Sequence, residues 1–401
     1  MIGEGEMAAS QDAVETNSTA VRHDVFKVTA ATCGALFVDS LLYSIVVPVL
    51  PNYADQFDVG SAGVSLLYAA YAVALLAGTP LMGRVGDRFG HERPFQVGAA
   101  GLLISTVGFA LARSYPELLA ARTLQGVAAA ALWTNGIALL AQRVRPPRAG
   151  GAMGAAMSSM SVGMVAGPVI GGLLAERFGD AAPFVVCTVL TAVLAAVLPW
   201  LVRGAAQPVR EQQPSGWRSL LPTLLAVAFG AATLSMLEPL LPLHLADRFG
   251  SGPATLGLIF GAATLAHGLA GVPVGLLGDR RPDLPLIPGG LLGMSAVLPL
   301  LPRFDVGWTT VLLVTFAVCF SFVLIPALGI LTAAAERRGV GHGAIFAMFN
   351  IAYAVGMMSG PLLGALGTGF SSVTTALTGM AAVLVLGAVL ILTAAQRRSV
   401  T

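Results

Sequence analysis

The chain has very little charge for its length. Its 401 residues include only 22 Lys and Arg and 20 Asp and Glu, or 10% of the total, whereas soluble domains carry about 25%. The formal net charge of +2 is too small to indicate binding to nucleic acid. Hydrophobic residues make up 56% of the chain, so most of its surface has to face something other than water. These numbers exclude a soluble fold and predict a protein embedded in a lipid bilayer.

Several kinds of functional motif are also missing. The three cysteines, Cys33, Cys187 and Cys319, are far apart and have no metal-site or disulfide spacing. The sequence contains no HExxH motif, no nucleophile elbow and no phosphate-binding loop of the form G-x-x-x-x-G-K-[ST]. We therefore expect no metal, no cofactor and no ATP-driven step. The chain is not expected to be an enzyme, and an integral-membrane enzyme is the disfavoured alternative of another class.

Long apolar runs recur along the whole chain. They are too long for strands and lack strict alternation, so an all-α polytopic fold is predicted. About 20 apolar residues are needed for each membrane-spanning helix. Twelve such helices fit the sequence, at residues 28–50, 62–82, 95–113, 117–142, 150–174, 182–202, 219–243, 254–277, 285–302, 306–334, 343–367 and 371–395.

Positive residues are distributed unequally between the two sets of loops. Seventeen Lys and Arg lie at the ends of the chain and in the loops of one side, whereas the opposite loops hold four, at Arg113, Arg177, Arg248 and Arg303. Because positive residues stay on the cytoplasmic side, both termini are predicted to be cytoplasmic. The Ala- and Gly-rich composition, with a single lysine, suggests a bacterial gene. We therefore expect a multi-pass protein of the bacterial cell (inner) membrane.

The sequence resembles itself at an offset near 192 residues. Pro48-Val-Leu-Pro51 is repeated as Pro239-Leu-Leu-Pro242, and the run Gly163 to Gly171 is repeated as Gly356 to Gly364. This repeat predicts two six-helix bundles related by a pseudo-twofold axis along the membrane normal, with a central site opened to either side by rocking. The predicted parts are a cytoplasmic tail at 1–27, bundles at 28–202 and 219–395, a linker at 203–218 and a second tail at 396–401.

The segment between the second and third predicted helices carries a specific motif. Gly83-Arg-Val-Gly-Asp87-Arg88-Phe-Gly90-His-Glu-Arg93 resembles the signature of the major facilitator superfamily at this place, and the second half repeats it around Asp279 and Arg280. In that family the acid latches the outward-facing state. The resemblance implies gating roles for Gly83, Asp87, Arg88, Gly90, Arg93, Asp279 and Arg280. Glu92 departs from the basic residue usual there.

Two further motifs lie inside predicted helices. Leu119-Ala-Ala-Arg122-Thr-Leu-Gln125-Gly126 resembles the superfamily's fourth-helix motif, and the run around Gly167-Pro168 and Gly171 resembles its antiporter signature in the fifth helix. An arginine inside a span costs several kcal/mol unless it meets a polar partner or water. Small residues beside a proline allow close helix contact at a moving interface.

The first and seventh helices narrow the resemblance. The run Asp39-Ser-Leu-Leu-Tyr43 before Pro48, and Glu238 before Pro239, resemble the vesicular monoamine and acetylcholine transporters and their bacterial relatives, the twelve-span drug:proton antiporters. The vesicular carriers have a lysine where we align Tyr71 and acids where we align Ser321 and Asn350. They also have a long luminal loop where this chain has only residues 51–61. These departures favour a bacterial multidrug-type exporter.

Three ionisable residues fall well inside predicted spans: Asp39, Arg122 and Glu238. The two acids lie at nearly equivalent places in the two halves, so we expect them to face one central cavity. Desolvation disfavours the charged form of a carboxylate, so such acids bind and release protons near neutral pH. With all three groups ionised the cavity has a charge of −1, which favours cations. The expected substrate-binding residues are Asp39, Tyr43, Tyr71, Trp133, Asn135, Glu238, Asn350 and Tyr353, with Tyr68 a further aromatic candidate.

These observations predict a secondary transporter that exports small amphipathic, cationic compounds in exchange for protons. Asp39 and Glu238 are the expected proton-coupling residues, and the proton gradient supplies the energy. The expected partners are a small-molecule substrate, protons and the bilayer, with the monomer as the functional unit. A symporter or facilitator that imports a nutrient has the same fold and stays open as an alternative.

Overall fold

The computed structural model describes residues 24–144, 148–203, 217–281, 285–338, 342–370 and 372–400. Within these residues the chain is helical and contains no strand. Most of the predicted N-terminal tail and most of the linker lie outside the described residues. The all-α fold predicted from the long apolar runs is confirmed.

The first half begins with a helix over residues 24–44. It continues with η1 (Val47–Val49), α2 (Leu50–Gln56), α3 (Ser61–Phe89), α4 (Glu92–Leu111), α5 (Tyr115–Arg143), α6 (Ala149–Phe178) and α7 (Ala182–Leu201). The second half consists of η2 (Trp217–Leu220), α8 (Leu221–Phe249), α9 (Pro253–Arg280), α10 (Leu286–Val297), α11 (Val306–Arg338), α12 (His342–Phe370) and α13 (Val373–Val400). Each of the twelve predicted helices has its counterpart here. Eleven of the described segments are long and apolar enough to cross a membrane, and α10 is shorter.

The ends of several helices differ from the prediction. The second helix continues through Pro80 and Gly83 to Phe89 and ends before Gly90, which has a φ of +83°. The glycine-rich motif that starts at Gly83 is therefore mostly helical. α10 ends at Val297, ahead of Pro299 and Pro302, although Leu298 still has helical backbone angles.

The Pro-x-x-Pro repeat has two different conformations. In the first half the chain leaves the helix after residue 44 and passes Pro48 in η1, whereas α8 runs without a break through Pro239 and Pro242. The first copy lies in a β-branched run, Ile45-Val-Val, and the second in a leucine-rich run. Because β-branched residues have lower helix propensity, the first copy breaks where the second does not.

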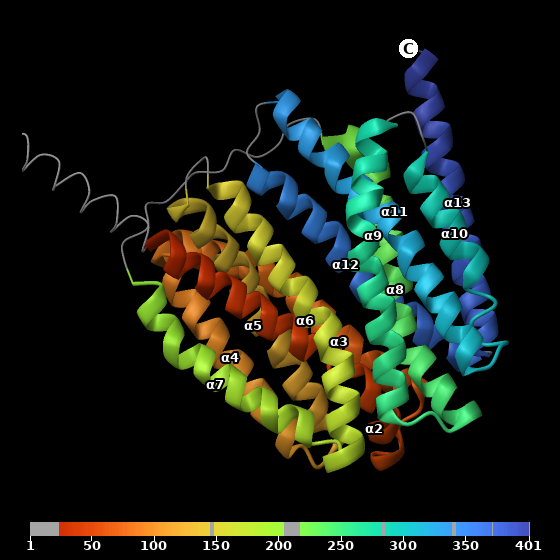
Figure 1. Ribbon diagram of the computed structural model, residues 1–401, viewed down its shortest axis with the longest axis horizontal. Coiled ribbons are helices and arrows are strands. Elements are labelled where there is room, and N and C mark those ends of the chain that lie inside the picture. The colour runs from red at the N-terminus through yellow and green to blue at the C-terminus, as the bar shows by residue number, and fades with distance from the viewer. Residues whose placement is uncertain are drawn as a thin grey trace, which may run out of the picture.

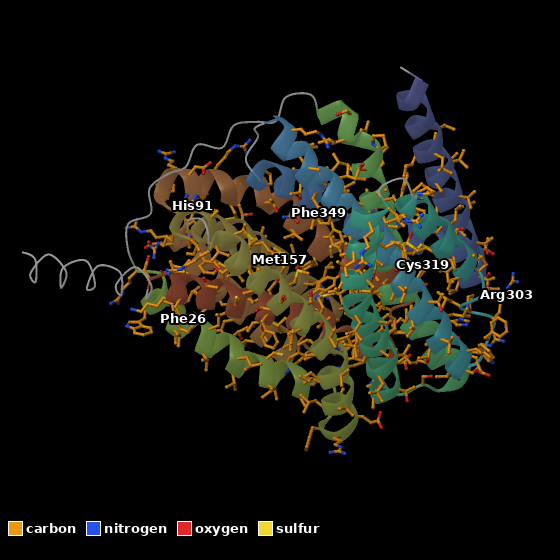
Figure 2. The ribbon with its side chains drawn as sticks, turned by 45° about the horizontal axis from the view of Figure 1, so that its top comes forward. Phe26, His91, Met157, Arg303, Cys319 and Phe349 are labelled. Carbon is orange, nitrogen blue, oxygen red and sulfur yellow. The ribbon has the colours of Figure 1, made fainter. Side chains whose placement is uncertain are left out.

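The two halves lie side by side (Figure 1), and four helices make most of the contacts across their boundary. α6 packs against α9, and α3 packs against α12. We call the end of the molecule with the arginine-poor loops, at residues 57–60, 179–181 and 250–252, the outer end, and the opposite end the inner end. Phe26 and His91 lie at the inner end, far from Arg303 at the outer end (Figure 2).

Contacts between the halves are concentrated toward the outer end. The Ser61 hydroxyl donates to Thr368 Oγ1 at 3.1 Å, and the Ala254 N–H donates to the Glu176 carboxylate at 2.9 Å. A Cβ at Gly172 would collide with the Pro253 carbonyl. Toward the inner end of the same helix, a Cβ at Gly151 or Gly154 would meet no atom of the described residues within 4 Å. In this conformation the halves are closed at the outer end, and α6 is freer at the inner end.

Candidate functional site

The two membrane acids are both buried between the halves. The relative exposure of Asp39, on the first helix, is 1%, and that of Glu238, on α8, is 5%. Neither side chain faces lipid. Their positions in the repeat differ from the expectation of near equivalence, since Asp39 lies nine residues before Pro48 and Glu238 lies directly before Pro239. Glu238 instead contacts the first helix one turn after Asp39, at Tyr43.

Each acid accepts a hydrogen bond from a neutral aromatic donor. Trp133 Nε1 donates to Asp39 Oδ2 at 2.8 Å, and the Tyr43 hydroxyl donates to Glu238 Oε2 at 2.5 Å. Among the described side chains, no Arg or Lys forms an ion pair within 4.0 Å of either carboxylate. The Tyr43–Glu238 bond also joins the two halves. Within the described residues, both carboxylates are therefore held by neutral donors and not by a direct ion pair.

Arg122, on α5, lies at the centre of a cage of three tyrosines. Its guanidinium carbon is 5.1 Å from the ring centroid of Tyr43, 4.8 Å from that of Tyr68 and 4.9 Å from that of Tyr71. These distances are typical of cation–π contacts. Arg122 Nη1 also donates to Gln125 Oε1 at 2.8 Å. The arginine is fully buried, and it interacts electrostatically with both acids.

Several buried polar atoms of this group have no hydrogen-bond partner among the described residues. They are Asp39 Oδ1, the Tyr68 hydroxyl, and Nε and Nη2 of Arg122. An unsatisfied buried polar group costs about 1–3 kcal/mol, and a native protein has few of them. Four such atoms lie together in this group.

The other predicted substrate-binding residues divide into two sets. Tyr353, on α12, stacks on Phe349 with ring centroids 6.2 Å apart and interacts electrostatically with Glu238. Asn135 does not join the acids, because its amide binds His91 and the Ala131 carbonyl. Asn350 is exposed on α12. The structure thus brings together the predicted residues Asp39, Tyr43, Tyr71, Arg122, Gln125, Trp133, Glu238 and Tyr353.

The motif between α3 and α4 lies at the inner end. Asp87 is exposed and lies 3.9 Å from His91 Nε2, while Nδ1 of His91 donates to Asn135 Oδ1 at 2.8 Å. A Cβ at Gly86 would collide with both His91 and Asn135. Gly90 ends α3, and the side chains of Arg88, Arg93 and Arg280 are exposed. Gly83 has Thr134 at ordinary contact distance. The side chain of Asp279 lies outside the described residues.

Glu92, the residue that departs from the family pattern, has a partner. It forms an ion pair with Arg143 at the end of α5, and Arg143 also lies 3.4 Å from Asp24 and donates to the Val202 carbonyl at 2.9 Å. One arginine thereby joins the inner ends of four helices of the first half. The sequence analysis noted Glu92 but did not find this contact, because the four segments meet only in the folded chain.

The glycines of the fourth- and fifth-helix motifs allow very close packing. A Cβ at Gly126 would collide with the Tyr71 carbonyl, and one at Gly167 would collide with Ser44 Oγ. At Gly171 it would lie 2.7 Å from the Ile45 carbonyl. The carbonyl of Pro168 lies against Gly257 of α9, across the boundary between the halves. The motif thus holds α6 both to the first helix and to the second half.

Comparison with known proteins supports the family that the sequence motifs resemble. The model of the Major Facilitator Superfamily matches residues 32–229 and again residues 223–400. The chain is 29% identical over 361 residues to a probable vesicular acetylcholine transporter-B of Danio rerio, covering 82% of this chain and 71% of that protein. It is 26% identical over 411 residues to the vesicular acetylcholine transporter of Rattus norvegicus, covering 84% and 76%.

Solved structures agree on the fold. A bacterial homologue of the human lysosomal transporter Spinster, in an inward-facing and unoccupied conformation, superposes with a TM-score of 0.74 at 16% identity, covering 93% of this chain and 96% of that one. The occupied form of the same homologue superposes with a TM-score of 0.73. With family matches over both halves and the expected helical fold, the chain belongs to the Major Facilitator Superfamily and is a transporter of that family.

Proposed function

We propose that the protein exports small amphipathic cations in exchange for protons. In this proposal it works as a monomer in the cell membrane of a bacterium, with both termini cytoplasmic, and uses the proton gradient without a cofactor. The bundles at 28–202 and 219–395 rock against each other about the linker at 203–218. The central site is then open alternately to the two sides of the membrane.

The observation that carries this proposal is the state of the two buried acids. Asp39 and Glu238 each accept a hydrogen bond from a neutral donor, and neither is ion-paired within the described residues. A buried carboxylate without a cationic partner is costly unless it binds a proton or another cation. The same two groups can therefore hold either protons or a positively charged substrate, and mutual exclusion of the two is what exchange requires.

A transport cycle follows from this exclusion. With the site open to the inner end, the ionised acids attract a cation and the site closes around it. With the site open to the outer end, protons from the more acidic side neutralise the carboxylates and the cation leaves. The protonated carrier returns and releases its protons to the inner side. The aromatic rings of Tyr43, Tyr71 and Tyr353 supply the apolar part of the binding surface.

The relatives support a cationic substrate, since those named above are described as transporters of acetylcholine, a small organic cation. Two features support a drug-type exporter over a vesicular carrier. The segment between α2 and α3 is short, at residues 57–60, and Tyr71 and Asn350 stand where the vesicular carriers have a lysine and an acid.

The experiment is transport in proteoliposomes that contain a pH-sensitive dye. A lipophilic cation added to wild-type vesicles should drive proton movement in the opposite direction, and an imposed proton gradient should drive uphill cation transport. Asp39→Asn and Glu238→Gln should lose both activities, whereas Glu117→Gln, an exposed acid at the outer end, should retain them. Unchanged coupling in both site variants would refute the proposal, and uphill movement of cation along with protons would support the importer alternative.

A further inference from the structure

The tyrosine cage is built like a cation-binding site, yet its occupant belongs to the protein. Tyr43 comes from the first helix, and Tyr68 and Tyr71 lie three residues apart on α3, so they share one helix face. The rings of Tyr43 and Tyr68 are close to perpendicular, with centroids 6.0 Å apart, and those of Tyr43 and Tyr71 are 5.0 Å apart. Cages of this kind recognise organic cations such as quaternary ammonium groups.

The guanidinium in this cage is held mainly by the faces of the rings. A guanidinium has five N–H donors, and here two of its nitrogens, Nε and Nη2, have no partner among the described residues. The hydrogen bond to Gln125 involves only Nη1. An arginine kept for structure alone would be expected to satisfy these donors with a carboxylate or carbonyl oxygens. The arrangement favours a side chain that can leave the rings.

The cage also lies directly beside the two acids. The hydroxyl of Tyr43, one of its three rings, donates to Glu238, and Asp39 lies one turn earlier on the same helix, with its Oδ1 unpartnered among the described residues. A cation that entered between the rings would therefore meet both the aromatic faces and the carboxylates. The guanidinium, displaced from the rings, would have two acids within its electrostatic reach.

We propose that Arg122 is a tethered competitor of the substrate, which occupies the cation cage when no substrate is bound and is displaced from it when a cationic substrate enters. The return of the guanidinium to the rings then assists release of the substrate. Arg122 is thereby a specificity-determining residue, since only a ligand with a positive group can replace it. This inference rests on the proposed function only for the positive charge of the substrate.

The test measures equilibrium binding of choline, a small quaternary ammonium probe, to the purified protein in detergent. Arg122→Gln should bind choline about tenfold more tightly than wild type, because the competitor is gone. Arg122→Lys keeps a tethered cation and should stay within about threefold of wild type. The neutral carbon isostere of choline, dimethylbutanol, should bind no better to Arg122→Gln than to wild type.

Loss of a positive charge alone also favours cation binding, so a double-mutant cycle with the cage is needed. Tyr68→Leu should weaken choline binding about tenfold in the Arg122→Gln background. In wild type the same change should have a much smaller effect on choline binding, because it weakens the binding of the Arg122 guanidinium to the rings as well as the binding of choline. Tyr115→Leu, which removes a tyrosine bonded to the Gly63 carbonyl at the outer end, is the control in both backgrounds.

The outcomes separate the alternatives. Equal effects of Tyr68→Leu on choline binding in the two backgrounds would overturn the inference. So would weaker choline binding by Arg122→Gln than by wild type, provided that the variant unfolds at the same temperature as wild type. If a variant fails to fold, a structure of the wild-type protein with choline decides: the ammonium should lie between the rings with the guanidinium outside them. A guanidinium that stays in place would contradict the proposal. Binding needs no proton gradient, so displacement can hold even if proton coupling fails.

Discussion

The two halves repeat the same packing but carry different chemistry. Gly163 and Gly356, one from each copy of the fifth-helix motif, both lie where a Cβ would collide with a carbonyl of the first helix of their own half, Phe37 and Ala228 respectively. A Cβ at Gly167 would collide with the hydroxyl of Ser44, and a Cβ at Gly360 would collide with the hydroxyl of Ser235. The duplication has preserved the places where backbones approach closely, because those contacts define the bundle.

The buried polar groups do not follow this symmetry. The first half supplies Asp39, Arg122, Gln125 and Trp133, together with the three tyrosines of the cage. The second half supplies Glu238. The other buried polar residues described in that half are hydroxyls such as Thr233, Ser235 and Ser321, which bond to nearby backbone, and Ser321 also bonds to His267. The difference teaches that most of the described buried polar groups of the candidate site come from one half, and that the second half contributes one acid, Glu238, and the ring of Tyr353.

The largest expected effect comes from breaking that connection. Glu238→Gln should abolish uphill transport, since it removes the only charged group that we assign to the site in the second half. Ser235→Ala, at a neighbouring buried position on the same helix, removes a backbone hydrogen bond worth about 1 kcal/mol and should leave most transport intact. Transport measured in vesicles checks both. Comparable losses in the two variants would mean that the hydroxyls matter as much as the acid.

The packing symmetry can be tested with matched glycine substitutions. Gly167→Val and Gly360→Val should each lower the free energy of unfolding by roughly 1–3 kcal/mol, because a side chain there meets backbone and a serine hydroxyl. Gly154→Val, where a Cβ meets nothing within 4 Å, is the control. Thermal unfolding in detergent measures all three, and a large difference between the first two variants would show that the halves are not equally packed.

A smaller effect is expected from the hydrogen bond that joins the halves at the site. Tyr43→Phe keeps the ring in the cage but removes the donor to Glu238. Hydrogen bonds to charged groups contribute about 1.5–3 kcal/mol, so transport should fall by about tenfold or more with little change in folding. Tyr68→Phe removes a hydroxyl that has no partner among the described residues, and its effect should be smaller. A larger loss of transport in Tyr68→Phe than in Tyr43→Phe would mean that the important polar contact is made by Tyr68 and not by Tyr43.

The smallest effect is expected at the outer contact between the halves. Glu176→Gln keeps an acceptor for the Ala254 N–H but removes the negative charge from the start of α9, a loss of about 0.3–1 kcal/mol. The outward-open population should rise modestly, by a fewfold, in accessibility measurements on a cysteine placed at the outer end. No change would mean that glycine packing alone closes this end.

The fold was largely predictable because each helix is a long apolar run between polar turns. The ends of the helices were less predictable. Residues 83–89 contain glycines and yet stay helical, and the first Pro-x-x-Pro breaks its helix while the second does not. These differences depend on neighbouring residues rather than on the motif itself.

The site was predictable only in part. Asp39, Glu238 and Arg122 were found because ionisable residues inside a span are costly, and Tyr43 because it lies one helical turn from Asp39. Trp133 and Tyr68 were named only as aromatic candidates. Which charged group each of them contacts was not predictable, because they meet those groups only through tertiary packing. Asn135 was expected at the substrate, whereas it binds His91 at the start of α4. One polar side chain inside a helix gives no sign of which neighbour it will meet.

The central claim is that the same two carboxylates bind either protons or the cation. The most direct test is calorimetry of choline binding in buffers with different ionisation enthalpies, which counts the protons released per cation bound. Wild type should release protons on binding, and the Asp39→Asn, Glu238→Gln double variant should release none. Proton release that is unchanged in the double variant, or absent in wild type across the pH range in which it transports, would contradict the account.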